Sequence, residues 1–224
     1  MTIEMPAPAA ATTTRIKVCG VTLADDAARV ASLGIDFLGL NFWPRSKRYV
    51  SPERAPLLAS VARANGAVHV VGLFVDADLD DIIAICDAVQ LDILQLHGDE
   101  SPDDVAAIAR ATKRPIWKAI AASSPADVAH LEVWPADAIL LDAPSPLRGG
   151  SGMPFDWTLA RTARHADPAR RLIIAGGLDP TNVATAVTQL APWAVDVASG
   201  VESAPGVKDA AKLEAFVTAV RSAT

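Results

Sequence analysis

Short apolar runs alternate with longer mixed stretches along the chain from Thr14 onward. The apolar runs are four to six residues long, as in strands that are buried on both faces of a parallel sheet. The stretches between them are rich in alanine and carry charges at helical spacing, which is typical of surface helices. The pattern predicts strands over 16–19, 37–41, 69–74, 93–96, 116–120, 138–141, 172–175 and 194–197, and helices over 24–33, 52–64, 79–87, 103–111, 125–133, 155–166, 181–190 and 210–223.

Three of the predicted helices carry a recognisable start signal. Ser51-Pro52, Ser101-Pro102 and Ser124-Pro125 each place a serine before a proline. A serine side chain caps the free N–H groups of a first helical turn, and proline is tolerated in that turn because its position needs no N–H donor. These dipeptides therefore support helices after the second, fourth and fifth strands.

Eight successive strand–helix pairs predict a parallel sheet, which is either open and doubly wound or closed into a barrel. An open dinucleotide-binding sheet carries a G-x-G-x-x-G motif after its first strand. Here the first strand is followed by Gly20-Val21-Thr22, which is not that motif. The sequence shows no linker or low-complexity segment over 15–224. We therefore predict a single (β/α)8 TIM barrel over 15–224, preceded by a disordered tail over 1–14.

Composition narrows the class of partner and the compartment. The 224 residues suit one domain, and the net charge of -6 with a pI near 5.1 disfavours nucleic acid or an anionic membrane as partner. Two cysteines, Cys19 and Cys86, are too few and too far apart for a disulfide framework, so we expect a cytoplasmic protein. No apolar run is long enough to span a bilayer, and 1–14 lacks the features of a secretory signal.

Glycines after the last two strands point to a phosphate. Gly176-Gly177 follows the seventh predicted strand, and Ser199-Gly200 follows the eighth. Active sites of this fold lie at the carboxyl ends of the strands, and the loops after strands seven and eight often bind phosphate. Backbone N–H groups approach an anion closely where glycine stands. Simple turn glycines are the alternative, but two adjacent loops favour a phosphate site, with Gly152 from 149–152 folding over it.

Two ionisable groups stand at strand ends where an acid and a base would work. Cys19 ends the first strand, and Asp142 follows the sixth. A free cysteine is usually a small buried apolar group, and Cys86 fits that description better than Cys19 does. A carboxyl group after three apolar residues is either an ion-pair or cap residue, or a desolvated acid with a raised pKa. Cys19 as general base and Asp142 as general acid would bracket one substrate.

Three other polar positions near the strand ends have two interpretations each. Arg48 lies in a basic loop that is either simply solvated or binds a carboxylate with a bidentate fork. His97 either packs the barrel mouth or contacts substrate. Lys17 shares a strand face with Cys19 and is expected to form a buried structural ion pair with Asp196 rather than to act in catalysis.

Segments that contain these residues occur in a recognisable order. They are IKVCGVT at 16–22, SKRYVSP at 46–52, QLHG at 95–98, LD at 141–142 with GGSG at 149–152 and FDW at 155–157, AGGLDP at 175–180, and DVASGVE at 196–202 with PGVKD at 205–209. Together they resemble the phosphoribosylanthranilate isomerase family of tryptophan biosynthesis. One departure is Ala198, where many members of that family have serine.

The resemblance implies a cofactor-free Amadori rearrangement of a phosphosugar substrate, with no metal. It implies that Cys19 is the base, Asp142 the acid and Arg48 the ligand of the anthranilate carboxylate, with His97 also in the substrate site. Phosphate would bind at Gly152, Gly176, Gly177, Ser199 and Gly200. The expected assembly is a monomer or a homodimer.

Three other functions remain open from the sequence. An Amadori isomerase of histidine biosynthesis would be expected to use two carboxylates, whereas one of the two groups here is Cys19. A Schiff-base aldolase would use Lys118 in the fifth strand, although its neighbours Trp117 and Ile120 indicate a buried structural lysine. A non-catalytic phosphosugar sensor would not need both Cys19 and Asp142.

Overall fold

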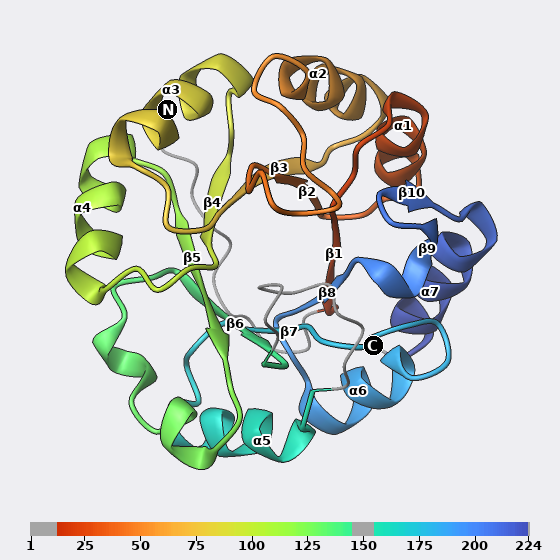
Figure 1. Ribbon diagram of the computed structural model, residues 1–224. Coiled ribbons are helices and arrows are strands. Elements are labelled where there is room, and N and C mark those ends of the chain that lie inside the picture. The colour runs from red at the N-terminus through yellow and green to blue at the C-terminus, as the bar shows by residue number, and fades with distance from the viewer. Residues whose placement is uncertain (1–12, 145–154, 224) are drawn as a thin grey trace.

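The computed structural model describes residues 13–144 and 155–223, and eight parallel strands close into a barrel in chain order (Figure 1). Each strand pairs with the next, and β8 pairs with β1. All eight predicted strands are present, with ends that agree within one residue. Their bounds are Arg15–Cys19 (β1), Phe37–Asn41 (β2), His69–Phe74 (β3), Ile93–Leu96 (β4), Ile116–Ala121 (β5), Ala138–Asp142 (β6), Leu172–Ile174 (β7) and Ala194–Val197 (β8).

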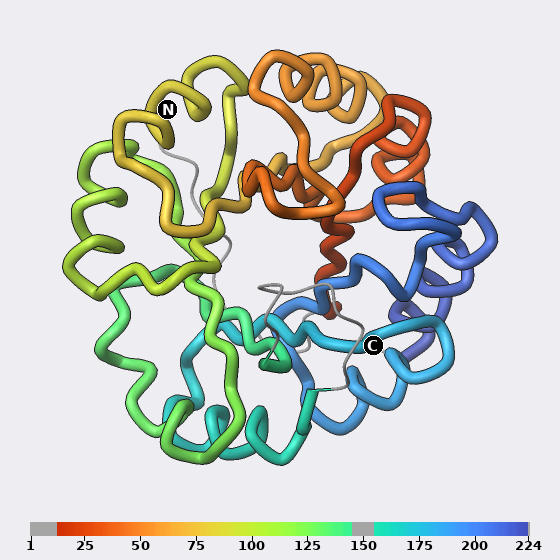
Figure 2. Tube along the Cα trace, viewed as in Figure 1, coloured from red at the N-terminus to blue at the C-terminus, as the bar shows by residue number. Residues whose placement is uncertain are grey.

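Helices form a ring outside the barrel, and the tube along the chain shows the same alternation between inner strands and outer helices (Figure 2). The serine cap expected at Ser101 is present, because its hydroxyl accepts from the N–H of Asp104. The helix after β2 begins a turn later than Ser51-Pro52 suggested. The α-helices are Ala24–Ser32 (α1), Ala55–Asn65 (α2), Leu79–Val89 (α3), Pro102–Thr112 (α4), Trp157–Ala166 (α5), Val183–Leu190 (α6) and Ala210–Ser222 (α7).

The helix predicted over 125–133 is wrong. Two short 3-10 turns, Pro125–Val128 (η1) and Leu131–Val133 (η2), occupy this segment. Its two buried apolar residues, Val128 and Leu131, lie at the end of η1 and at the start of η2. Pro135 follows closely and prevents a longer helix.

A small hairpin after β8 was not predicted. A short 3-10 turn at Ser199–Val201 (η3) leads into Glu202–Ala204 (β9), which pairs antiparallel with Val207–Lys208 (β10). Each strand is too short to produce an alternating pattern in the sequence. The hairpin lies between β8 and α7 and is tied to the barrel by the buried side chains of Glu202 and Lys208.

The barrel separates two apolar cores. One fills the space between strands and helices, and the other fills the barrel interior. Three aromatic side chains, Phe37, Trp117 and Trp193, pack against one another within the interior core, with ring centroids 4.8–5.7 Å apart. This interior core is solid, so a ligand can enter only at an end of the barrel.

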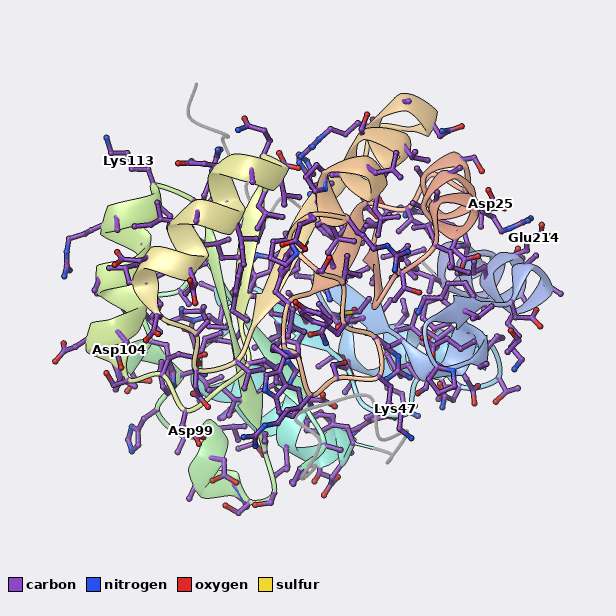
Figure 3. All side chains as sticks on the ribbon, turned by 45° about the horizontal axis from the view of Figure 1, so that its top comes forward. Asp25, Lys47, Asp99, Asp104, Lys113 and Glu214 are labelled. Carbon is purple, nitrogen blue, oxygen red and sulfur yellow. The ribbon has the colours of Figure 1, made fainter. Side chains whose placement is uncertain are left out.

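The strand ends of interest all open on the same end of the barrel, because all eight strands run parallel. In Figure 3, Lys47 and Asp99, which follow the ends of β2 and β4, lie toward one end of the molecule. Lys113, at the carboxyl end of α4, lies toward the other end. We call the end beyond the carboxyl termini of the strands the barrel mouth.

The first residues of the chain fall mostly outside this description. Residues 1–12 of the tail predicted over 1–14 lie outside the described residues. Thr14, which was assigned to the tail, is buried, and its hydroxyl donates to the carbonyl of Pro192 at 3.3 Å. Among the residues described, no helix combines the length and the apolar character needed to cross a bilayer.

Candidate active site

Cys19 lies at the carboxyl end of β1, with its side chain directed into the barrel mouth. In the β1–β2 pairing it stands opposite Gly39. A Cβ atom at position 39 would come within 2.9 Å of the Cys19 sulfur and 3.2 Å of Lys17 Nζ. Glycine at position 39 therefore provides the space that the thiol and the ammonium group occupy.

The surroundings of Cys19 favour the neutral thiol. Burial raises the pKa of Cys19, and the ammonium group of Lys17 only partly opposes this effect. Proton abstraction requires the thiolate. The protein alone therefore does not lower the pKa of this thiol, and we expect that bound substrate lowers it.

Asp142 lies at the end of β6 and is almost completely buried. Its Oδ1 accepts a hydrogen bond of 2.8 Å from the N–H of Ala143. Burial is the largest influence on this carboxyl group and raises its pKa to about 6. At that pKa about a tenth of the molecules carry the protonated acid at pH 7, against roughly a thousandth for an ordinary aspartate. The raised pKa that a general acid needs is thus present without substrate.

A buried ion pair lies between the two groups. Lys17 Nζ contacts Asp196 Oδ1 at 3.0 Å, which confirms the predicted pairing of Lys17 with Asp196. Both members act electrostatically on Cys19 and on Asp142. The base and the acid proposed from the sequence therefore share one electrostatic environment in the barrel mouth.

A second chain of polar side chains reaches Asp142 from β4. His97 Nε2 lies 3.6 Å from Asp142 Oδ2, and Gln95 Nε2 lies 3.1 Å from His97 Nδ1. With the Gln95 amide as donor, the neutral imidazole carries its proton on Nε2, facing the carboxyl group. His97 therefore packs the mouth beside Asp142, and its contact with substrate stays a prediction.

The glycines after β7 and β8 come together at the mouth. Gly176 and Gly177 both have positive φ, at 80° and 67°, a conformation that other residues rarely adopt. A Cβ atom at Gly176 would lie 2.9 Å from Asp142 Oδ1, so this loop passes directly beside the acid. A Cβ atom at Gly200 would collide with the carbonyl of Leu178, so the two loops touch.

The predicted phosphate residues are partly exposed where described. Gly176, Gly177, Ser199 and Gly200 are neither fully buried nor fully exposed, which leaves their backbones accessible to a ligand. Gly177 is not in the first turn of a helix, because α6 begins only at Val183. The prediction that Gly152 binds phosphate lies outside the described residues.

Arg48 lies close to Cys19, but its guanidinium already has a partner. Nε and Nη2 of Arg48 donate to the two carboxylate oxygens of Glu202, at 2.8 and 2.6 Å. The aliphatic part of Arg48 packs over Gly20, where any Cβ atom would collide with it. The predicted carboxylate ligand is thus rigidly held, and Nη1 lies outside the ion pair.

The surroundings of Lys118 and Cys86 agree with the structural roles expected for them. Lys118 Nζ is buried, contacts Glu100 Oε2 at 2.7 Å and lies over the ring of Trp134, which agrees with a structural lysine. Cys86 is buried in α3, as expected.

A cavity of about 330 Å³ lies between the ends of β4 and β5. His97 and Lys118 are among the residues that line it, and it offers room for part of a ligand.

The sequence predicted no individual role for three residues at the mouth. Gly39, Glu202 and Lys208 make close contacts with Cys19 or Arg48. Glu202 and Lys208 belong to segments that carry the family resemblance, but nothing local in the sequence connects them with the first strand. Among the described residues, no group of three or more His, Cys, Asp or Glu side chains is arranged to hold a metal ion.

Comparison with known proteins gives a consistent result over almost the full chain. A family model described as N-(5'phosphoribosyl)anthranilate (PRA) isomerase matches residues 16–219. The chain is 45% identical over 217 residues to N-(5'-phosphoribosyl)anthranilate isomerase of Ralstonia nicotianae, covering 94% of each chain. A Geobacter protein of the same name is 43% identical over 205 residues, which cover 91% of this chain and 96% of the relative.

Solved structures agree with these relatives. The phosphoribosyl anthranilate isomerase of Thermotoga maritima superposes with a TM-score of 0.83 at 37% identity, covering 93% of this chain and 99% of that one. A second structure of such an isomerase contains reduced 1-(o-carboxyphenylamino)-1-deoxyribulose 5-phosphate. It superposes with a TM-score of 0.80 at 34% identity, covering 93% of this chain and 99% of the other.

Proposed function

Since this chain belongs to the N-(5'-phosphoribosyl)anthranilate isomerase family, we propose that its barrel mouth converts N-(5'-phosphoribosyl)anthranilate to 1-(2-carboxyphenylamino)-1-deoxyribulose 5-phosphate. The observation that carries the proposal is the pairing of a buried carboxyl group of raised pKa with a buried thiol at one end of the barrel. The relative with a bound reduced product shows that this fold accepts a ligand of that chemistry. In this assignment the chain is an intramolecular aldose–ketose isomerase.

The first chemical step is assigned to Asp142. Its carboxyl proton moves to the ring oxygen of the furanose, the bond between that oxygen and C1 breaks, and the nitrogen lone pair forms a Schiff base with C1. The carboxyl group becomes a carboxylate in this step. Because the pKa of Asp142 approaches the working pH, a fraction of the molecules already carries the protonated carboxyl group that the step requires.

The second step is assigned to Cys19. Its thiolate removes the proton from C2, and the electrons of that C–H bond form the C1–C2 double bond of an enolamine while the nitrogen regains its lone pair. The enolamine then becomes the ketone when its hydroxyl proton is lost and C1 gains a proton. Proton exchange with solvent restores the thiolate and the carboxyl group, and His97 Nε2 lies 3.6 Å from the oxygen Oδ2 of that carboxyl group.

Binding is assigned to the two ends of the substrate. The loops after β7 and β8 are proposed to hold the phosphate with backbone N–H groups of Gly176, Gly177, Ser199 and Gly200, with Gly152 added from the β6 side. Arg48, in the loop after β2, is proposed to bind the anthranilate carboxylate. Two anchors of this kind hold the sugar carbons between acid and base, and such positioning contributes several kcal/mol to a reaction.

Partners and compartment follow the same assignment. We propose a phosphosugar as the small-molecule ligand and cytoplasm as the site of action, with no cofactor, nucleic acid or membrane involved. A structure of the Thermotoga maritima relative is described as that of monomers generated from a dimeric isomerase. For this chain a monomer or a homodimer remains the prediction.

A direct assay separates this function from its alternatives. Fluorescence of freshly prepared phosphoribosylanthranilate should decay with the purified protein, and the corresponding aminoimidazole substrate of the histidine-pathway isomerase should react far more slowly. Preference for the second substrate would favour the histidine-pathway reaction. Binding without turnover of either substrate would favour a sensor and contradict the proposal.

A further inference from the structure

A buried cluster of charged side chains joins the two ends of the proposed site. It consists of Arg48, Glu202 and Lys208, and we call it the Glu202 cluster. The two carboxylate oxygens of Glu202 accept hydrogen bonds from Nε and Nη2 of Arg48. Lys208 Nζ also donates to Glu202 Oε1, at 2.8 Å. The side chains of Glu202 and Lys208 are 4% and 0% exposed, so water does not compete for these contacts.

Within the cluster, Arg48 is held by one edge. The bidentate pair uses Nε and Nη2 and fixes the plane of the guanidinium, whereas a single contact would leave it free to rotate. Packing against Gly20 restricts the aliphatic part of the same side chain. The orientation of Nη1 is therefore set by Glu202 and not by solvent.

Lys208 connects Glu202 to the backbone of the base. Its Nζ donates to the carbonyl of Cys19 at 2.6 Å and to the carbonyl of Ala198 at 3.3 Å. Its backbone N–H donates to Asp26 Oδ2 at 2.9 Å, which anchors the hairpin against α1. The end of β1, the end of β8 and the arginine loop are thus joined through one carboxylate.

Stability alone is a weak reason for such a cluster. Replacing a buried ion pair by apolar side chains of similar volume is often neutral or stabilising, because charges lose their hydration when they are buried. A fixed geometry, by contrast, is what an ionic cluster with several hydrogen bonds supplies. The position of the cluster between Arg48 and Cys19 indicates what that geometry serves.

We propose that Glu202 is a positioning residue: by holding one edge of Arg48 and the ammonium group of Lys208, it fixes the arginine in register with Cys19 so that Nη1 receives the carboxylate of the substrate. This proposal rests on the proposed function, since it takes Arg48 as the ligand of that carboxylate. Glu202 itself does not touch the substrate.

The test measures how much the carboxylate of a ligand contributes to binding. Two inert ligands are compared by calorimetry: the reduced carboxyphenylamino-deoxyribulose 5-phosphate, and the same compound with a plain phenyl ring. Glu202→Gln keeps the volume but turns an amide N–H₂ toward groups that are already donors. It should lower the affinity for the carboxylated ligand by roughly tenfold to a hundredfold and change the affinity for the phenyl ligand by less than about threefold.

Two further variants separate positioning from loss of structure. Arg48→Ala should produce the same selective loss, and adding Glu202→Gln to Arg48→Ala should produce no further loss. Asp92→Asn is the matched control, because Asp92 also joins an arginine to the backbone, through Arg63 Nη2 and the N–H of Val70, but at the other end of the barrel. It should lower Tm without changing the discrimination between the ligands.

Equal weakening of both ligands by Glu202→Gln would show a purely structural role and overturn the proposal. Tighter binding of the carboxylated ligand would show that Glu202 competes with the substrate for Arg48, and would also overturn it. If neither ligand binds the wild-type protein, the proposed function itself fails, and this inference fails with it. If the wild type binds both ligands equally well, Arg48 is not the carboxylate ligand, and the inference fails together with that binding assignment, whereas the proposed isomerase reaction is not contradicted.

Discussion

The carboxyl group of Asp142 illustrates how a site residue acts against the stability of its own fold. Burial raises its pKa to about 6, which means that the protein would be more stable if this group did not ionise. A group with a raised pKa in the folded state binds its proton more tightly there than in the unfolded chain. Stability is therefore lost as pH rises from the unfolded pKa near 4 to the folded pKa near 6.

Asp142→Asn should accordingly stabilise the protein at neutral pH, by up to about 3 kcal/mol, because about two pH units separate the two pKa values. Urea unfolding of both proteins at pH 4 and pH 7.5 checks this. The difference should be small at pH 4, where the wild-type carboxyl group is almost fully protonated in the folded state and about half protonated in the unfolded chain. An equal difference at both pH values would mean that burial of the charge is not its cause.

At the scale of elements, the site depends on loops that touch one another. The loop after β8 meets the loop after β7 at Gly200 and Leu178, and the latter loop passes beside Asp142 at Gly176. Two separate loops thus form one surface next to the acid. Their contact depends on backbone approach, so a single methyl group is enough to disturb it.

Gly200→Ala should raise KM for substrate and weaken inhibition by inorganic phosphate, each by about tenfold or more, because the new methyl group collides with a backbone carbonyl that cannot rotate away. Steady-state kinetics with phosphate as competitor measures both effects. Ser203→Ala, at an exposed position in the neighbouring hairpin, is the control and should change neither. Unchanged phosphate inhibition in Gly200→Ala would contradict the assignment of these loops.

Prediction from sequence succeeded where local pattern decides the outcome. The apolar runs placed every strand end within one residue, and strand ends placed Cys19 and Asp142 at the mouth. The pattern failed over 125–133, where two short 3-10 turns stand in place of the predicted helix and Pro135 prevents its continuation. It also gave no individual role to Glu202 and Lys208, because the bond from Lys208 to the carbonyl of Cys19 joins residues 189 positions apart.

At the scale of the whole molecule, closure of the barrel brings the first and the last barrel strand together. The pairing of β1 with β8 places Lys17 opposite Asp196, and their ion pair lies above the aromatic interior core. Removing one member leaves the other buried without its counter-charge, which is costly, whereas removing both replaces the pair with apolar packing. Lys17 and Asp196 thus contribute both to the closure of the barrel and to the electrostatic environment of the site.

Lys17→Met should destabilise the protein by about 3–5 kcal/mol, and the double variant Lys17→Met with Asp196→Leu should recover most of that loss. Denaturant midpoints of the single and double variants provide the comparison. Arg63→Met, which breaks a more exposed ion pair with Asp92, should cost less than about 1 kcal/mol. Additive losses in the double variant would show that the two side chains stabilise the barrel independently.

Turnover of phosphoribosylanthranilate by Cys19→Ala and by Asp142→Asn, measured under single-turnover conditions on protein of verified fold, tests the assignment of base and acid most directly. The account predicts that each variant loses at least about 100-fold in rate, because each lacks one of the two proton transfers. Affinity for the reduced product should change far less, because neither group serves as an anchor for the ligand. A variant that keeps its rate within tenfold of wild type would contradict the role given to that residue.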